Sequence, residues 1–142
     1  MHIEKSIEHL VKSMFKNMPP NLGNALGITY ESISKDEVIA VMPVNKNTIQ
    51  PFGLLHGGAS VALGESICSV GAWVNCADND KSAVGIEINA NHLKGVRSGI
   101  VRGIAKPIQR GRTVHVWQYE IFTEDNKPVC TGRCTLAIVN RR

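Results

Sequence analysis

One stretch restricts the fold more than any other: residues 57–77 are almost wholly apolar and carry a single charged side chain, Glu65. This composition predicts one long helix over residues 56–77 that is apolar nearly all round, so more than one surface has to cover it. A sheet curled around the helix would do this. Because such a sheet still leaves edges and an uncovered face, we expect the chain to form homo-oligomers.

The flanking sequence supplies that sheet. Apolar residues at helical spacing between Ile3 and Met14 predict a short amphipathic helix that stops before Pro19-Pro20. Residues 45–55 form a polar loop, and in the run 86–92 the even-numbered residues are expected on one face. The strand-like runs cover residues 25–34, 37–44, 86–92, 99–108, 112–123 and 128–139. Strands that precede and follow one apolar helix along the chain favour an α+β fold, in which an antiparallel sheet packs against the helix. The length of the chain predicts a single domain of residues 1–142.

Composition excludes several classes of protein. Residues 1–15 alternate charged with apolar side chains, unlike a secretory signal, and no run approaches the roughly 20 apolar residues that span a bilayer. We therefore expect a cytoplasmic protein without membrane contact, whose cysteines are reduced thiols of the core. The five histidines form no metal-binding pair, so no metal site is expected. The cysteines are Cys68, Cys76, Cys130 and Cys134.

Positive charge is concentrated between Lys94 and Arg112, and no acidic residue occurs between Glu87 and Glu120. Such a run indicates either an anionic partner or a solvated basic face of the sheet. Nucleic acid is not the expected anion, because no nucleic-acid-binding motif occurs and aromatic residues make up only 5% of the chain. The basic residues are Lys94, Arg97, Arg102, Lys106, Arg110 and Arg112.

Glu65 is the main candidate for chemistry. A carboxylate is expensive to bury in an apolar helix without a partner, so a helix that needed only packing would carry another residue there. The alternative is that Glu65 lies on the wet side of the helix or caps a buried donor. Gly57 and Gly58 open the helix, where first-turn N–H groups and the positive end of the dipole can hold an oxyanion. The alternative is that the two glycines only permit a tight turn from the loop into the helix.

Three further side chains lie close to these groups in sequence. Ser69 follows Glu65 by one helical turn and can orient the carboxylate or a water, although a helical serine more often bonds its own backbone. Gln50 and His56 flank the loop before the helix, and both can polarise a carbonyl group. For His56, a role as a plain cap residue is the alternative.

The motifs of other enzyme classes are missing. The sequence has no G-x-S-x-G elbow, no phosphate-binding loop and no dinucleotide fingerprint. The remaining candidates are one carboxylate, oxyanion donors and a basic run that can bind a negatively charged part of a substrate. This set suits hydrolysis of an activated acyl ester. Two alternatives remain: a hydratase or dehydratase that pairs the carboxylate with His56, and a non-catalytic acyl-CoA-binding protein.

Residues 50–73 resemble the hotdog-fold acyl-CoA thioesterases of the phenylacetic-acid-degradation type, in which an HGG motif precedes a glutamate by seven residues. The stretches GIEINANHLKGVRSG (85–99) and KPIQRGRTVHVWQYEIF (106–122) match the same family, so the resemblance spans residues 8–139. Within the family the chain is most similar to the thioesterases of 1,4-dihydroxy-2-naphthoyl-CoA in menaquinone biosynthesis and to the proofreading thioesterases of enterobactin synthesis. This implies an aromatic or hydroxyaromatic acyl-CoA substrate, with 1,4-dihydroxy-2-naphthoyl-CoA as one candidate.

The resemblance also implies roles for single residues. Glu65 would be the nucleophile or the general base, the Gly57 N–H with Gln50 or His56 would polarise the thioester carbonyl, and Ser69 would support them. Lys94, Arg110 and Arg112 would bind phosphate groups. No separate cofactor is implied, since coenzyme A is part of the substrate. The resemblance also implies that the assembly is a homodimer, or a homotetramer built as a dimer of dimers. The positions that match the coenzyme A site are Gly85, His92, Leu93, Lys94, Gly95, Gln109, Arg110, Gly111, Arg112, Thr113 and Val114.

Overall fold

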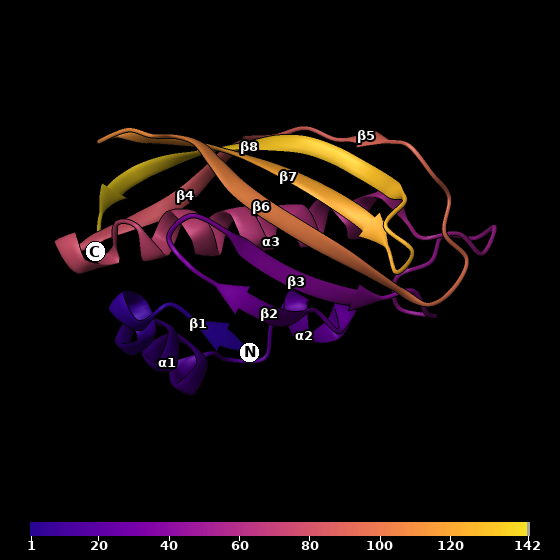
Figure 1. Cartoon of the computed structure of the whole chain (residues 1–142), viewed down its shortest axis with the longest axis horizontal. Helices are drawn as coiled ribbons and strands as arrows, with labels where there is room; N and C mark the ends of the chain where they lie inside the picture. Colours follow the sequence, from indigo (N-terminus) through magenta and orange to yellow (C-terminus); the bar gives the residue numbers. More distant parts are fainter. Residues whose placement is uncertain (142) are drawn as a thin grey trace.

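The computed structural model describes residues 1–141, in which a curved sheet packs along the long helix α3 (Figure 1). Helices α1 and α2 lie at the lower side of the view, away from β7 and β8. In chain order the elements are β1 (His2–Ile3), the 3-10 helix η1 (Lys5–Ile7), α1 (Glu8–Asn17), α2 (Leu22–Leu26), β2 (Thr29–Ile33), β3 (Val38–Pro43), α3 (Gly57–Val74), the 3-10 helix η2 (Ala77–Asn79), β4 (Lys81–Ile88), β5 (Asn91–His92), β6 (Ile100–Arg110), β7 (Val114–Thr123) and β8 (Pro128–Asn140).

The strands form one sheet in the order β1-β2-β3-β6-β7-β8-β4, with β5 also paired to β8. Every pair is antiparallel except β1 with β2, which run parallel. The α+β architecture, with an antiparallel sheet around one long helix, is therefore confirmed. In the described chain β1 and β4 are the edge strands, and β4 packs against α3.

Two glycines let α3 approach the sheet closely. Trp117 and Tyr119, both fully buried, point inward from β7. A Cβ atom on Gly64 would lie 2.5 Å from the Tyr119 ring, and one on Gly71 would lie 2.5 Å from the Trp117 ring. Since real Cβ atoms do not come so close to other heavy atoms, the two aromatic rings occupy the space that larger helix residues would need.

The sheet covers only one side of α3, although the sequence predicted a helix apolar nearly all round. Leu63, Ile67 and Cys68 are fully buried against the strands. On the other side, Glu65 and Ser69 keep partial exposure to solvent. The helix ends at Val74, three residues before the predicted end, and η2 follows it.

The N-terminal helix begins later than predicted. His2–Ile3 pairs with β2 as the short parallel strand β1, and the Glu4 N–H donates to the Ile33 carbonyl oxygen at 3.0 Å. After η1 the helix α1 spans Glu8–Asn17, and it stops before Pro19-Pro20 as expected. Helical spacing alone does not reveal that a neighbouring strand captures the first residues.

The predicted strand 25–34 is wrong in its first part, because Leu22–Leu26 forms the short helix α2. Asn21 and Asn24 make a reciprocal capping box at its start, and Gly27 ends it with a φ of 74°. That left-handed conformation is easily adopted only by glycine. The strand β2 therefore starts at Thr29.

The predicted run 86–92 is also corrected. The strand starts earlier, at Lys81, and a bulge between Gly85 and Glu87 interrupts the alternation of faces. Ile86 is 61% exposed as a result, so it does not share a buried face with Ile88. The Tyr119 hydroxyl donates to the Asn89 carbonyl oxygen at 2.8 Å and ties the segment between β4 and β5 to the core.

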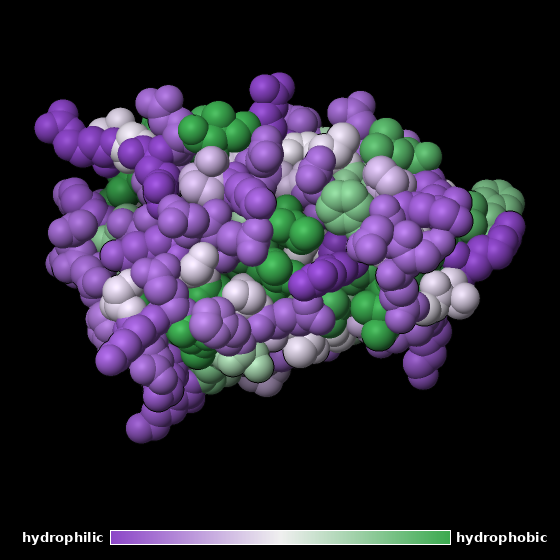
Figure 2. All heavy atoms as spheres, in the orientation of Figure 1, coloured by the Kyte–Doolittle hydropathy of each residue, from purple (hydrophilic) through white to green (hydrophobic). Residues whose placement is uncertain are grey.

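All four cysteines are buried free thiols, as the sequence predicted for core positions. Figure 2 shows a surface that is polar over most of this view, with apolar side chains gathered in its middle. Val84 on β4 and Val139 on β8, at the β4 edge, are 52% and 40% exposed. None of the helices within residues 1–141 has the length and apolar character needed to cross a bilayer.

Replacing Gly71 tests the close packing of α3. Helix propensity alone predicts that Gly71→Ala stabilises the protein by up to ~1 kcal/mol. The Trp117 ring occupies the space for the new methyl group, so we expect a loss of about 1–3 kcal/mol instead. Urea unfolding followed by circular dichroism measures the difference, and a gain in stability would contradict the packing described here.

Candidate active site

The N-terminus of α3 presents hydrogen-bond donors to solvent. His56 caps the helix, and its Nδ1 accepts from the Gly58 N–H at 2.8 Å. Because Nδ1 is an acceptor, the neutral ring carries its proton on Nε2, and this side chain is exposed. In the described chain the Gly57 N–H donates to no backbone or side-chain acceptor. The helix start therefore offers the Gly57 N–H and the His56 Nε2–H to a ligand oxygen.

His92 lies directly against this helix start. A Cβ atom on Gly57 would lie 2.8 Å from His92 Nε2, so a larger residue at this position would have to displace the exposed His92 ring. The segment after His92 runs along the loop before α3, where the Leu55 N–H donates to the Val96 carbonyl oxygen at 2.7 Å. The structure thus brings His92 beside Gly57 and the segment that follows His92 beside the loop before α3.

Gln50 opens the tight turn that leads into α3. Its Oε1 accepts from the Phe52 N–H, and Gly53 completes the turn with a φ of 81°. With Oε1 engaged, the Nε2 group remains as a donor. Phe52 at the tip of this turn is 84% exposed.

Glu65 lies half-buried on the open side of α3. A Cβ atom on Gly85 would lie 2.9 Å from Glu65 Oε1, so the lack of a side chain on β4 leaves room for the carboxylate. Within residues 1–141 no ion pair engages this carboxylate. The side chain borders a hollow of about 460 Å³ that Gly58, Val61 and Ser69 also line. An unpaired carboxylate at the edge of a hollow can accept a proton or attack a bound electrophile.

The two halves of the predicted site share a face but do not meet. Gly57 and Glu65 are eight residues apart, which corresponds to about 12 Å along the helix axis. One carbonyl group cannot contact both within a single chain. His56 and Gly57 lie together at the start of α3, and Gln50 lies in the turn before it. Glu65 lies beside Ser69 and Gly85.

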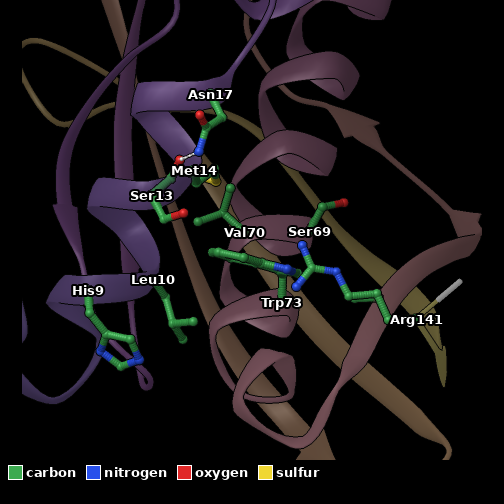
Figure 3. Close-up of a pocket in the computed structure, with 10 residues that line it drawn as sticks. His9, Leu10, Ser13, Met14, Asn17, Ser69, Val70, Trp73 and Arg141 are labelled. Atoms are coloured by element: carbon green, nitrogen blue, oxygen red, sulfur yellow. Dashed lines mark hydrogen bonds between the residues drawn. The ribbon is translucent and has the colours of Figure 1, made fainter.

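Sequence reasoning missed the residues beyond Ser69. A cavity of about 570 Å³ continues from Ser69 to Trp73 and is closed on its other side by α1 (Figure 3). The spacing contained a usable signal, because Glu65, Ser69 and Trp73 follow one another at intervals of four residues and so share a helix face.

Three of the six residues of the basic run are engaged in ion pairs. Arg102 contacts Glu31 at 2.9 Å, and Lys106 contacts Glu37 at 3.2 Å. Arg110 contacts Asp36 at 2.7 Å. All three pairs are at least partly exposed, so each contributes little to stability. Much of the run therefore belongs to a solvated face of the sheet, which was one of the two interpretations of the sequence.

The predicted phosphate partners lie in two separate places. Lys94 follows β5 near the start of α3, whereas Arg110 donates to Asn75 Oδ1 at 3.3 Å, just past the end of α3. The length of α3 corresponds to roughly 27 Å. The hairpin turn between β6 and β7 carries the second group, and the Gly111 N–H donates to the Val114 carbonyl oxygen at 2.9 Å. This second group consists of Gln109, Arg110, Gly111, Arg112, Thr113 and Val114.

Three titratable groups near α3 have pKa values that are shifted toward the neutral form. Burial raises the pKa of Tyr119, and burial followed by the charge of Arg110 lowers the pKa of His115. The hydrogen bond with Cys134, together with burial, raises the pKa of Cys68. Glu65 is the only acidic or basic residue of α3. No group of three or more potential metal ligands occurs among the described residues.

Comparison with known proteins identifies relatives. Residues 52–130 match the model of the thioesterase superfamily. The chain is 49% identical over 119 residues to the 1,4-dihydroxy-2-naphthoyl-CoA hydrolase of Escherichia coli, covering 84% of this chain and 87% of that protein. It is 42% identical over 114 residues to the proofreading thioesterase EntH of Cronobacter sakazakii, covering 80% and 82%. The crystal structure of a mutant thioesterase from Pseudomonas aeruginosa superposes with a TM-score of 0.83 at 44% identity, covering 94% and 93%.

The cap at His56 can be tested by stability alone. We expect His56→Ala to destabilise the protein by about 1 kcal/mol, because the Gly58 N–H loses its acceptor. His56→Asn supplies another good capping acceptor and should recover most of this loss. Equal unfolding midpoints in urea for His56→Ala and the unmodified protein would show that the cap contributes nothing.

Proposed function

The chain belongs to the thioesterase superfamily, and on that premise we propose that it hydrolyses an acyl-CoA thioester to a free acid and coenzyme A. The observation that carries the proposal is the position of Glu65. It is the one charged side chain of α3, it has no ion-pair partner in the described chain, and it borders the open hollow that Val61 and Ser69 also line.

The start of α3 would bind the thioester carbonyl oxygen. The Gly57 N–H and the His56 Nε2–H are preorganised donors, and the positive end of the helix dipole adds to their effect on a developing oxyanion. The Gln50 Nε2 group can hold either the carbonyl oxygen or the water. Because His56 Nδ1 is engaged by Gly58, His56 acts here as a donor, which disfavours the base that a hydratase would require.

Glu65 would supply the reacting carboxylate by one of two routes. As a general base it takes a proton from water, the resulting hydroxide adds to the carbonyl carbon, and the C–S bond breaks to release the thiolate. Glu65 then returns the proton to the thiolate sulfur. As a nucleophile it forms a mixed anhydride and expels the thiolate, and water then cleaves the anhydride. Both routes give the same acid and coenzyme A.

A second copy of the chain would complete the site. When two antiparallel copies of α3 are related by a two-fold axis near Val61, Glu65 of one helix lies opposite Gly57 of the other. Val61 lines the hollow on the open face, where such a contact would form. This arrangement removes the separation of about 12 Å that prevents one chain from acting alone.

The exposed edge of the sheet supports the same assembly. The edge strand β4 presents Val84 and Ile86, which are 52% and 61% exposed. An unpaired apolar edge is a template for association with another copy. We propose a homodimer, or a dimer of such dimers, with the active site between two chains.

The proposed substrate has two parts, the acyl group and coenzyme A. An aromatic acyl group is supported by the relative named 1,4-dihydroxy-2-naphthoyl-CoA hydrolase. For the phosphates of coenzyme A, either Lys94 or Arg112, which lie near opposite ends of α3, is suited because the described ion pairs leave its charge uncompensated. The reaction needs no further cofactor.

Removal of the carboxylate tests the proposed function. We expect Glu65→Gln to reduce kcat for thioester hydrolysis by far more than tenfold, with an unchanged melting temperature. Glu120→Gln, on an exposed part of β7, is the matched control and should retain full activity. Release of free thiol from a panel of acyl-CoA substrates provides the measurement.

The threshold for rejection is clear. A Glu65→Gln variant that keeps more than about a tenth of the kcat has lost less than roughly 1.4 kcal/mol of barrier lowering. Glu65 would then not be the catalytic group. Absence of hydrolysis by the unmodified protein across the whole panel would reject the thioesterase function itself.

A further inference from the structure

The segment 85–92 borders both parts of the proposed site. A Cβ atom on Gly85 would lie 2.9 Å from Glu65 Oε1, and one on Gly57 would lie 2.8 Å from His92 Nε2. One end of the segment therefore lies beside the carboxylate, and the other end lies beside the start of α3. In the proposed dimer these two ends belong to different sites, so the position of the segment affects both sites.

An interrupted strand ladder holds the middle of the segment. β4 pairs with β8 as far as Ile88, and β5 resumes the pairing at Asn91, which places Asn89 opposite Arg133. In a hydrogen-bonded antiparallel pair, the two residues normally exchange two backbone bonds. Here the Asn89 N–H donates to the Arg133 carbonyl oxygen at 3.0 Å, but the Arg133 N–H donates to Asn89 Oδ1 at 3.2 Å. The Asn89 side chain thus replaces its own backbone carbonyl in the ladder.

The released carbonyl group turns inward to Tyr119. The Tyr119 hydroxyl donates to the Asn89 carbonyl oxygen at 2.8 Å. A Cβ atom on Gly132 of β8 would lie 2.0 Å from that oxygen and 2.8 Å from the hydroxyl, so this close approach requires glycine. Because a buried hydroxyl or carbonyl group without a partner is costly, the bond is a firm link between the core and the segment.

Tyr119 joins this segment to the helix that carries Glu65. Its ring is fully buried against Gly64, where an added Cβ atom would come within 2.5 Å. That contact needs only the ring, which phenylalanine would supply equally well. The hydroxyl therefore has an effect of its own, which is to fix the segment 85–92 relative to α3. Burial raises the pKa of Tyr119, so the hydroxyl stays protonated and serves as a donor.

We propose that Tyr119 and Asn89 are positioning residues for thioester hydrolysis. Their hydrogen bond holds the segment against α3 and so keeps Gly85 beside the carboxylate and His92 beside the helix start. Tyr119 is fully buried, so it acts through the segment and does not contact the substrate. This inference rests on the proposed thioesterase function, because it concerns the geometry of that site.

Removal of either partner of the bond tests the proposal. Tyr119→Phe keeps the ring and removes the donor. Asn89→Ala removes Oδ1, so the Arg133 N–H takes back the backbone carbonyl at position 89 and draws it away from Tyr119. We expect each variant to lower kcat by about tenfold, because small displacements around a reacting centre slow the reaction strongly. The probe is benzoyl-CoA or, where it is hydrolysed faster, another member of the acyl-CoA panel.

Two comparisons distinguish positioning from a general loss of stability. If both substitutions break the same bond, the double variant should also lose about tenfold, whereas independent effects would multiply to about a hundredfold. Asn89→Asp keeps an acceptor for the Arg133 N–H, so it should retain kcat within about twofold.

The chain offers two matched controls. Tyr30→Phe removes the hydroxyl of the other tyrosine, whose ring packs against Phe15. Ile33→Val destabilises the core at a fully buried position of β2, which is far from β4 in the strand order. Both should keep kcat within about twofold. Hydrogen–deuterium exchange gives a readout besides activity, since peptides that contain residues 85–92 should exchange faster in Tyr119→Phe and Asn89→Ala but not in the controls.

The outcomes separate this inference from the proposed function. If the unmodified protein hydrolyses no member of the panel, the proposed function fails, while the exchange data still decide whether the bond holds the segment. Unchanged exchange in both variants would show that the bond does not hold it. Faster exchange with kcat at the level of the controls, or losses that multiply in the double variant, would overturn the positioning role. If Tyr119→Phe does not fold, Asn89→Ala and Asn89→Asp decide the question together.

Discussion

The contact between α3 and the aromatic residues of β7 is the constraint on which the rest of the structure depends. Gly64 and Gly71 sit against Tyr119 and Trp117 so closely that a single added carbon atom would meet a ring at 2.5 Å. This contact fixes both the depth and the rotation of the helix. Since Glu65 follows Gly64 by about 100° around the helix axis, the same contact turns the carboxylate toward the open side. The position of the charged group is thus a consequence of core packing.

The open side explains why the site is divided. One curved sheet covers one side of α3, and on the other side the carboxylate stays partly solvated, which avoids the cost of burying an unpaired charge. The donors at the helix start lie about 12 Å away on the same face. A second copy placed over that face would join the two groups and exclude water, and electrostatic interactions gain strength when water is excluded. In this account, assembly and catalysis depend on the same surface.

The sequence predicted the main elements well where local patterns decide the structure. The apolar run 56–77 with its paired glycines predicted α3, the helix that carries Glu65. Local signals were overlooked in the segment 21–27, where the Asn21–Asn24 capping box and Gly27 delimit a helix whose last two residues had been included in the predicted strand 25–34. Other errors come from tertiary contacts. The bulge at Gly85–Glu87 and the separation of Lys94 from Arg110 depend on how distant strands pair, which spacing along the chain does not encode. The wall that α1 forms on one side of the cavity likewise depends on tertiary contacts.

The most direct test of a site shared between two chains is complementation between inactive variants. One variant carries Glu65→Gln, and the other combines Gln50→Ala with His56→Ala. The two are co-expressed with different tags, and assemblies that contain both are purified. If the site joins Glu65 of one chain to the helix start of the other, each mixed dimer contains one intact site and should show about half of the wild-type thioester hydrolysis. Activity no higher than that of either parent variant would show that each chain carries a complete site of its own.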